Sequence, residues 1–142
     1  MTTAHKVTAN EILFITDEYI ASKPMYGLQE WIETSVYNAF PEELKGRVKN
    51  LTIPTVGQVF GWDDEWCRKT FVRDDDEQLP LMKERRNRVA YLDNDYEWGW
   101  LQNSTKQEIS SATFAFVHYS GLAGYGSASN SGGVRLEFTL VK

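Results

Sequence analysis

The last residues of the chain carry the pattern that most restricts its fold. Apolar and polar side chains alternate there without interruption: the apolar set is Val134, Leu136, Phe138 and Leu140, and the polar set is Arg135, Glu137 and Thr139. This period of two is typical of a strand with one face in the core and the other in solvent. The sequence therefore predicts a half-buried strand over residues 134–140, with its polar set on the outer face.

Three segments before this strand define its surroundings. Residues 111–119 place apolar side chains on both faces, which predicts a central strand covered on both sides. Residues 121–133 are rich in Gly, Ser and Asn, which predicts a loop. If residues 97–101 form a strand, Trp98 and Trp100 share one face, where we expect core packing rather than ligand stacking.

Two helices and two further strands are predicted nearer the start. Residues 11–16 form a short apolar run, predicted as a strand, although its length leaves a helix open. Apolar residues recurring at three and four predict the main helix over about 27–40, and Pro41 ends it and opens a short second helix. Residues 51–56 predict an edge strand, because their proline cannot donate to a ladder, and a helix over about 55–60 is the alternative.

The most polar part of the chain is residues 68–88. It contains an acidic block at 74–77 and a basic block at 83–88. We interpret this span as a solvated excursion whose two charge blocks face one another across a loop. Residues 89–92 then predict a short strand that returns to the core.

Composition limits the classes of protein to which the chain can belong. Its 142 residues, 42% of them hydrophobic, predict a single domain over 1–142, with residues 1–10 as a flexible arm. The net charge of −5 argues against a nucleic-acid partner. Cys67 is the one cysteine, and with only His5 and His118 it gives neither an internal disulfide nor a zinc site.

The start of the chain is polar and lacks the apolar core of a secretory signal. No run is long enough to cross a bilayer, so we expect no membrane insertion. Assembly into a larger particle is then one route by which the protein would reach the outside of a cell.

Several segments taken together resemble a known family. They are Leu28-Gln-Glu-Trp31-Ile on a helix, Trp98-Gly-Trp-Leu-Gln-Asn-Ser104, Phe114-Ala-Phe-Val with Ser120-Gly121, and the ending Gly133-Val134-Arg135. In this order they resemble a family of uncharacterised domains of bacteria and their phages that has a C-type-lectin-like fold. The chain is more distantly similar to the sulfatase-modifying, formylglycine-generating enzymes and to phage receptor-binding lectin domains. The resemblance begins at about Ile12 and is strongest from Trp98 to Phe138.

The resemblance implies an α+β fold: a C-type-lectin-like domain with one twisted antiparallel sheet, the main helix and the short second helix. The chain departs from the family motifs at three places. Gln102 replaces arginine in Leu-Arg-Ser, Leu136 replaces proline after Gly-Val-Arg, and the Trp-Leu-Asn motif reads Trp31-Ile-Glu33. The apolar pattern survives these changes, so the fold expectation stands, but a ligand role of the family arginine does not transfer to Gln102.

Acidic stretches at 63–65, 74–77 and 93–97 suggest calcium, the usual lectin cofactor. In the last of them, however, Trp98 and Ser104 occupy the glycine position and the final acidic position of an EF-hand loop. We therefore expect a plain acidic turn there, and no cofactor.

Catalytic groups are also missing from the sequence, so we expect no enzyme. His118 lies in an apolar strand, where a core or face residue is more common than a base, and no Gly-x-Ser-x-Gly elbow is present. The enzymes that the chain distantly resembles rely on cysteine pairs, which Cys67 alone cannot supply. We predict that Cys67 is a small buried hydrophobe beside Trp66.

Recognition through the surface remains as the expected function. In C-type-lectin-like domains the loops near the end of the chain commonly carry recognition, and Tyr with Ser and Asn makes an adaptable binding surface. The predicted ligand-binding residues are Tyr119, Tyr125, Ser127, Ser129, Asn130 and Ser131. The alternative is that residues 121–133 only connect two core strands.

Two function classes follow. The first is a non-catalytic recognition module that binds a cell-surface glycan or protein, as part of a phage tail or virion assembly. The second is a structural or decoration protein of a phage particle, in contact with other virion proteins or with copies of itself. Both place the protein in a virion, or in the bacterial cytoplasm before assembly.

Overall fold

The structure, a computed structural model, describes the backbone of residues 1–142 and every side chain other than that of Tyr96. The strands are β1 (Thr2–Val7), β2 (Glu11–Thr16), β3 (Ala21–Lys23), β4 (Val48–Thr52), β5 (Ala90–Leu92), β6 (Asp95–Glu97), β7 (Gly99–Ser104), β8 (Thr113–Val117), β9 (Ala123–Ser127), β10 (Gly132–Val134) and β11 (Glu137–Val141). The helices are α1 (Leu28–Trp31), the π-helix η1 (Ile32–Val36), α2 (Glu42–Lys45), α3 (Val56–Phe60), α4 (Glu65–Thr70), the 3₁₀ helix η2 (Pro80–Lys83) and α5 (Arg85–Arg88). Strands and short helices together confirm the predicted α+β class.

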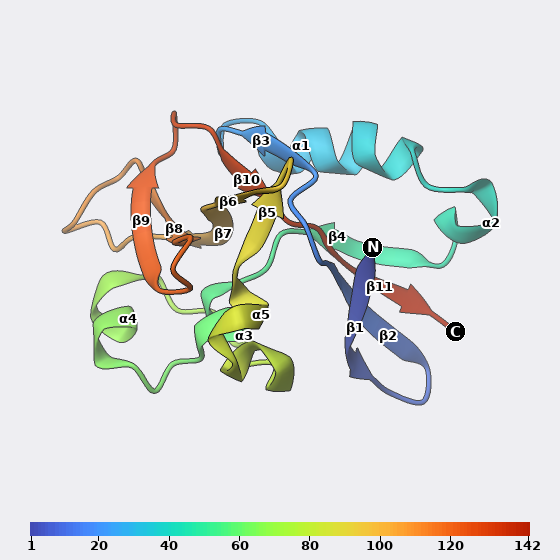
Figure 1. Cartoon of the computed structure of the whole chain (residues 1–142), viewed down its shortest axis with the longest axis horizontal. Coiled ribbons are helices and arrows are strands. Elements are labelled where there is room, and N and C mark those ends of the chain that lie inside the picture. Colours follow the sequence, from blue (N-terminus) through green and yellow to red (C-terminus); the bar gives the residue numbers. More distant parts are fainter.

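The first sheet joins the two ends of the chain. Its strand order is β1-β2-β11-β4, and all its pairings are antiparallel. Figure 1 shows this sheet on the side of the molecule that holds both termini, and β8, β9 and α4 on the opposite side. The flexible arm predicted for residues 1–10 is therefore wrong, because residues 2–7 form β1 and pair with β2.

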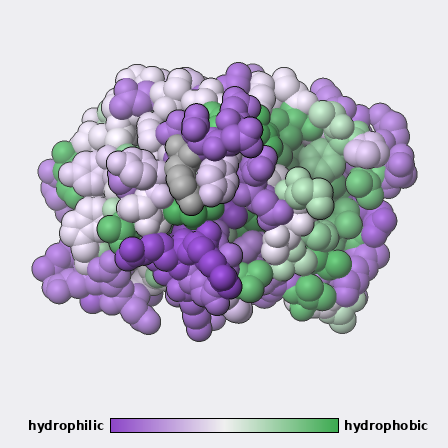
Figure 2. Space-filling model, viewed as in Figure 1, coloured by the Kyte–Doolittle hydropathy of each residue, from purple (hydrophilic) through white to green (hydrophobic). Residues whose placement is uncertain are grey.

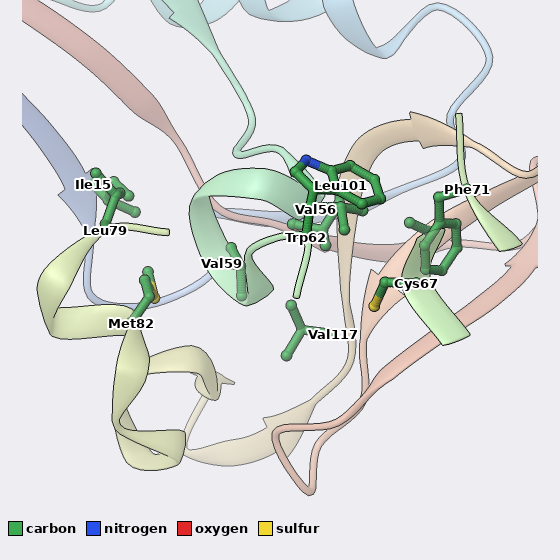
Figure 3. Packing of buried hydrophobic residues seen from close by; sticks show 11 residues of the cluster. Ile15, Val56, Val59, Trp62, Cys67, Phe71, Leu79, Met82, Leu101 and Val117 are labelled. Atoms are coloured by element: carbon green, nitrogen blue, oxygen red, sulfur yellow. The ribbon is translucent and has the colours of Figure 1, made fainter. Parts of the chain in front are cut away.

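Two apolar clusters cover the two faces of this sheet. On one face, Phe14 and Phe138 stack with ring centroids 5.6 Å apart and pack with Ile32 of η1. On the other face, Ile15 packs with Val59 of α3 and with residues of η2 (Figure 3). In the view of Figure 2, hydrophobic side chains gather over β1 and β2, while hydrophilic residues cover α5.

The second sheet has the order β3-β10-β7-β8-β9. β8 lies between β7 and β9, and its side chains enter both clusters, which confirms the prediction of a central strand covered on both faces. Trp100, which is 1% exposed, and Trp98 pack in the core as predicted, with ring centroids 4.9 Å apart. The single antiparallel sheet that the resemblance implies is thus replaced by two main sheets and a β5–β6 hairpin.

One pairing in the second sheet is parallel, between Gly133 of β10 and Gly99 of β7. The ring of Tyr19 lies against both glycines. A Cβ on Gly99 would lie 2.3 Å from Tyr19 Cε1, and one on Gly133 would lie 2.7 Å from Tyr19 Cγ. Both positions therefore require glycine.

The closing stretch differs from its prediction in two ways. It forms two strands rather than one, because β10 ends at Val134 in the second sheet and β11 begins at Glu137 in the first. Its polar set is also buried: Arg135, Glu137 and Thr139 are 8%, 6% and 8% exposed. The prediction of a half-buried strand is therefore wrong. The apolar and polar side chains lie on two faces that are both covered by protein, and neither face is open to solvent.

Residues 135–136 make the crossing from one sheet to the other. The Arg135 Nε donates to the Thr16 carbonyl at 2.7 Å, and Arg135 Nη1 donates to the Asn87 carbonyl at 3.0 Å. The Leu136 backbone N–H donates to Thr16 Oγ1 at 3.0 Å. Proline, which the resembled family has at the position of Leu136, could not make this bond.

Both helices predicted in the first part of the chain are present in the structure. α1 and η1 together confirm the main helix, and α2 follows Pro41 as predicted. For residues 55–60 the helical alternative is the correct one: Thr55 and Gln58 form a capping box at the start of α3. Among the described residues, no helix is both long and apolar enough to cross a membrane.

The polar span from 68 to 88 is more than a solvated excursion. Asp74 accepts hydrogen bonds from Gly57 N, Trp62 Nε1 and Asn103 Nδ2, at 3.0, 3.1 and 2.8 Å. Its acidic block therefore fixes the start of α3. The basic block makes a local ion pair between Arg86 and Glu84, and no ion pair among the described side chains joins the two blocks.

The acidic stretch from Asp93 forms a hairpin turn. Leu92 pairs with Asp95, and the two residues between them, Asp93 and Asn94, have φ of 52° and 73°. Two successive positive φ values are the mark of a type I′ turn, in which Asp and Asn are favoured. The stretch therefore forms the turn between β5 and β6.

Candidate functional site

The six predicted ligand-binding residues fall at three places along β9. Tyr119 lies before the strand, in a turn closed by the Gly121 N–H on the His118 carbonyl at 2.8 Å. Tyr125 lies within β9. The remaining four lie at or after its end, where they follow the strand into a second turn: Ser127, Ser129, Asn130 and Ser131. The predicted loop over 121–133 is therefore wrong in its middle, because β9 occupies residues 123–127.

In the second turn, polar groups hydrogen-bond to one another. The Asn130 N–H donates to the Ser127 carbonyl at 3.0 Å, and the hydroxyls of Ser127 and Ser129 lie 2.9 Å apart. Between them Ala128 is fully buried, and its carbonyl accepts from Met25 N at 2.9 Å. Five residues of extended chain span roughly 15 Å, so this turn does not share a site with Tyr119.

Tyr125 is brought together with a residue far away in sequence, Trp66 of α4. Their rings are nearly parallel, with an interplanar angle of 17° and centroids 6.4 Å apart. Trp66 is 44% exposed and Tyr125 is 43% exposed. Two large aromatic side chains thus present a common surface to solvent, which we call the Trp66–Tyr125 platform.

Local structure fixes Trp66 in this position. Asp64 caps α4 by accepting from the Trp66 backbone N–H at 2.9 Å. The Trp66 indole and the buried Phe71 ring make a T-shaped contact, with centroids 5.5 Å apart. These contacts limit the rotation of the indole, so the platform is formed before any ligand arrives.

A depression of about 380 Å³ adjoins the platform. Besides the two platform residues it is lined by Phe116, His118, Ser120, Leu122, Ala123 and Gly124. Gly124 lets the Phe116 ring lie close to the backbone of β9, because a Cβ there would lie 2.5 Å from Phe116 Cε1. None of the lining residues carries a carboxylate, an amine or a guanidinium.

His118 contributes a directed hydrogen-bonding group. Its Nδ1 accepts from the Ser120 backbone N–H at 3.2 Å and lies 2.7 Å from Ser120 Oγ. A ring nitrogen that accepts an N–H has no proton of its own, so the proton of the neutral imidazole is on Nε2. His118 therefore offers an Nε2–H donor at the edge of the depression.

The sequence pointed to Tyr125 but not to Trp66. Trp66 is 59 positions before Tyr125, and only the packing of α4 against β9 brings the two together. The charged residues nearby, at 63–65 and 68–69, were the available signal, since a core tryptophan rarely has such neighbours. Gln102, at the position of the family arginine, donates to the Ile53 carbonyl at 2.8 Å and lies outside this depression.

The chemistry of Cys67 fits the sequence prediction. Its side chain is fully buried, and burial, with Asp64 beside it, raises the pKa of the Cys67 thiol to about 12. The thiol is therefore protonated at neutral pH and is a poor nucleophile. Among the described side chains, no group of three or more His, Cys, Asp or Glu is arranged to hold a metal ion.

Comparison of the chain with protein-family models, with curated proteins and with solved structures finds no match.

Proposed function

We propose that the protein is a non-catalytic recognition module that binds a glycan on the Trp66–Tyr125 platform. The observation that carries the proposal is the pair of nearly parallel, half-exposed rings beside a depression of about 380 Å³. Isolated exposed aromatics are common, whereas two held together on packed elements offer the large apolar area that supports binding of a sugar ring.

The chemistry of the depression selects the kind of sugar. The C–H groups of a pyranose ring carry partial positive charge and pack on the negative faces of aromatic rings. The His118 Nε2–H and the Ser120 hydroxyl would bond to sugar hydroxyls at the edge. Because no charged residue lines the depression, an uncharged sugar suits it better than an acidic one.

The proposal extends to the fold family and the setting. Antiparallel pairing of the last strand, β11, with β2 near the start of the chain, together with one main helix and a short second one, supports a C-type-lectin-like assignment. Recognition of a host-cell glycan by a protein of a phage tail or virion accords with the resemblance. Binding of a cell-surface protein is the second reading. It is favoured by Leu122, which lines the depression and is 51% exposed, and by Tyr119, which is 56% exposed and whose ring centroid lies 3.9 Å from that of His118.

A glycan array together with whole-cell binding tests the function. We expect the wild-type protein to bind neutral glycans and Trp66→Ala or Tyr125→Ala to reduce that binding at least tenfold. Tyr26→Ala is the matched control, because Tyr26 is an exposed tyrosine (65%) that does not line the depression. Binding to cells but to no glycan, lost in the same two variants, would favour the protein ligand. Equal binding by all variants would refute the platform.

A further inference from the structure

A second site is indicated on the other half of the molecule, where β4 pairs irregularly with β11. Glu137 pairs with Thr52 and Thr139 with Lys49, so β4 uses one more residue than β11 over this stretch. Asn50 lies in the bulge with φ of 55°. Bulges of this kind often redirect a side chain beside a binding site, and Asn50 and Glu137 line the same groove.

The Glu137 carboxylate is buried, and only one of its two oxygens accepts a hydrogen bond from a described residue. Its Oε2 accepts from Gln58 Nε2 at 3.0 Å, whereas its Oε1 makes no hydrogen bond to any described residue. The residue is 6% exposed. A buried carboxylate oxygen without a donor is costly, so this atom marks a place where a donor group is expected.

Glu137 lies in the lining of a groove of about 1090 Å³ between the first sheet and the chain around residues 75–83. His5 lines the same groove, is 8% exposed, and its Nδ1 also lacks a partner among the described residues. Among the described residues, the two that carry a buried side-chain atom without a hydrogen bond thus line one groove.

The charge of the groove is negative. Its lining includes the carboxylates of Glu11, Asp75, Asp76 and Glu77 in addition to Glu137, against the ammonium groups of Lys6 and Lys83. Burial raises the pKa of the Glu137 carboxyl to about 7, as expected of a carboxylate that lacks a counter-charge. A cationic ligand would supply that charge.

The single free oxygen decides which cation fits. A guanidinium binds carboxylates through two parallel hydrogen bonds, but Gln58 already holds Oε2 of Glu137. A divalent metal needs several oxygen ligands, and no described group of three or more candidate side chains is placed to supply them. An alkylammonium is a compact cation whose N–H donors need only one acceptor each, and Thr139 and His5 lie in the same lining.

We propose that this groove is a second binding site, which takes an aliphatic primary ammonium group and bonds it to Oε1 of Glu137. The carboxylates of Asp75 and Glu77 at the rim attract the cation, and Glu137 receives it at the floor. The ammonium comes either from a small diamine or from a lysine side chain of a partner protein. This site does not depend on the Trp66–Tyr125 platform.

Isothermal titration calorimetry of the full chain at pH 8 tests the proposal. The probes are putrescine, a capped tripeptide Gly-Lys-Gly, and tetramethylammonium, which has the charge but no N–H donor. We expect at least one of the first two probes to bind at least tenfold more tightly than tetramethylammonium, and the tighter of them to identify the source of the ammonium. Glu137→Gln should weaken that binding at least tenfold, and the Asp75→Asn/Glu77→Gln double variant several-fold.

Trp66→Ala is the control that separates this site from the platform, and it should bind the amine as the wild type does. The fold of each variant is checked by its thermal midpoint, so that a loss of binding is not a loss of structure. Affinity unchanged in Glu137→Gln, or no primary amine bound more tightly than tetramethylammonium, would overturn the proposal. Amine binding without any glycan binding would leave it intact and would refute only the function proposed for the platform.

Discussion

Glu137 couples the stability of the protein to pH. Burial raises the pKa of its carboxyl from 4.5 to about 7, with the Gln58 hydrogen bond acting in the opposite direction. Because the folded chain holds this proton more tightly than the unfolded chain, the contribution of Glu137 to the free energy of unfolding is greatest below pH 4.5. It falls between pH 4.5 and 7 and is constant above pH 7.

Glu137→Gln should remove this dependence. At about 1.4 kcal/mol per pH unit, the variant gains about 3 kcal/mol relative to the wild type on going from pH 4 to pH 8. Urea titrations of both proteins at several pH values measure the difference. Burial and Arg135 lower the pKa of His5, so that residue acts in the opposite sense, but it is present in both proteins and cancels. A parallel pair of stability curves would contradict the prediction.

At the scale of single elements, α3 depends on a carboxylate from outside the helix. Asp74 accepts from Gly57 N, Trp62 Nε1 and Asn103 Nδ2, and also from Asp76 N at 2.9 Å. Its removal leaves buried donors without acceptors, which costs more than the bonds themselves contribute.

Asp74→Ala should therefore lower the free energy of unfolding by about 2–4 kcal/mol. Asp75→Ala is the matched control, because the neighbouring carboxylate is exposed and should change the free energy by less than about 0.5 kcal/mol. Chemical denaturation followed by tryptophan fluorescence gives both values. Equal effects of the two substitutions would show that Asp74 does not hold α3.

The elements that the sequence predicted correctly are those whose pattern is local. The main helix follows from apolar residues spaced at three and four, and β8 from apolar residues on both faces. The prediction for the closing stretch is wrong because alternation shows only that the two faces of a strand differ in polarity. It does not show whether solvent or protein covers each face. Gln58 and the carbonyls that receive Arg135 come from distant parts of the chain, and they let polar side chains be buried.

The residues of the candidate site could likewise be predicted only where the signal is local in the sequence. Tyr125 could be selected from its own neighbourhood, since a tyrosine among Gly and Ser is typical of a binding surface. Trp66 could not, because its pairing with Tyr125 arises from tertiary packing. The turn with Ser127 and Ser129 has binding-type composition, yet its groups largely bond to one another.

At the scale of the whole molecule, Arg135 connects the two main sheets. It lies between β10 and β11, and its guanidinium donates to the Thr16 carbonyl at the end of β2 and to the Asn87 carbonyl in α5. Burial lowers the pKa of the Arg135 guanidinium below its ordinary value, and the group remains the cation that these carbonyls require.

Arg135→Lys should lower the free energy of unfolding by about 2–3 kcal/mol, because one ammonium cannot reach carbonyls on two sides as a planar guanidinium does. Lys49→Arg, the reverse exchange at an exposed position, is the control and should be close to neutral. Thermal unfolding measures both. A wild-type midpoint for Arg135→Lys would mean that charge alone, and not the geometry of the guanidinium, holds the crossing between the sheets against β2 and α5.

The central claim is that a sugar lies on the Trp66–Tyr125 platform, and the indole N–H resonances test it most directly. The chain has five tryptophans, and comparison with the spectrum of Trp66→Phe assigns the signal of Trp66. On titration with the neutral glycan best bound on the array, the Trp66 signal should shift with saturation, while those of the buried Trp62 and Trp100 stay in place. A saturated complex in which the Trp66 signal does not move would contradict the account.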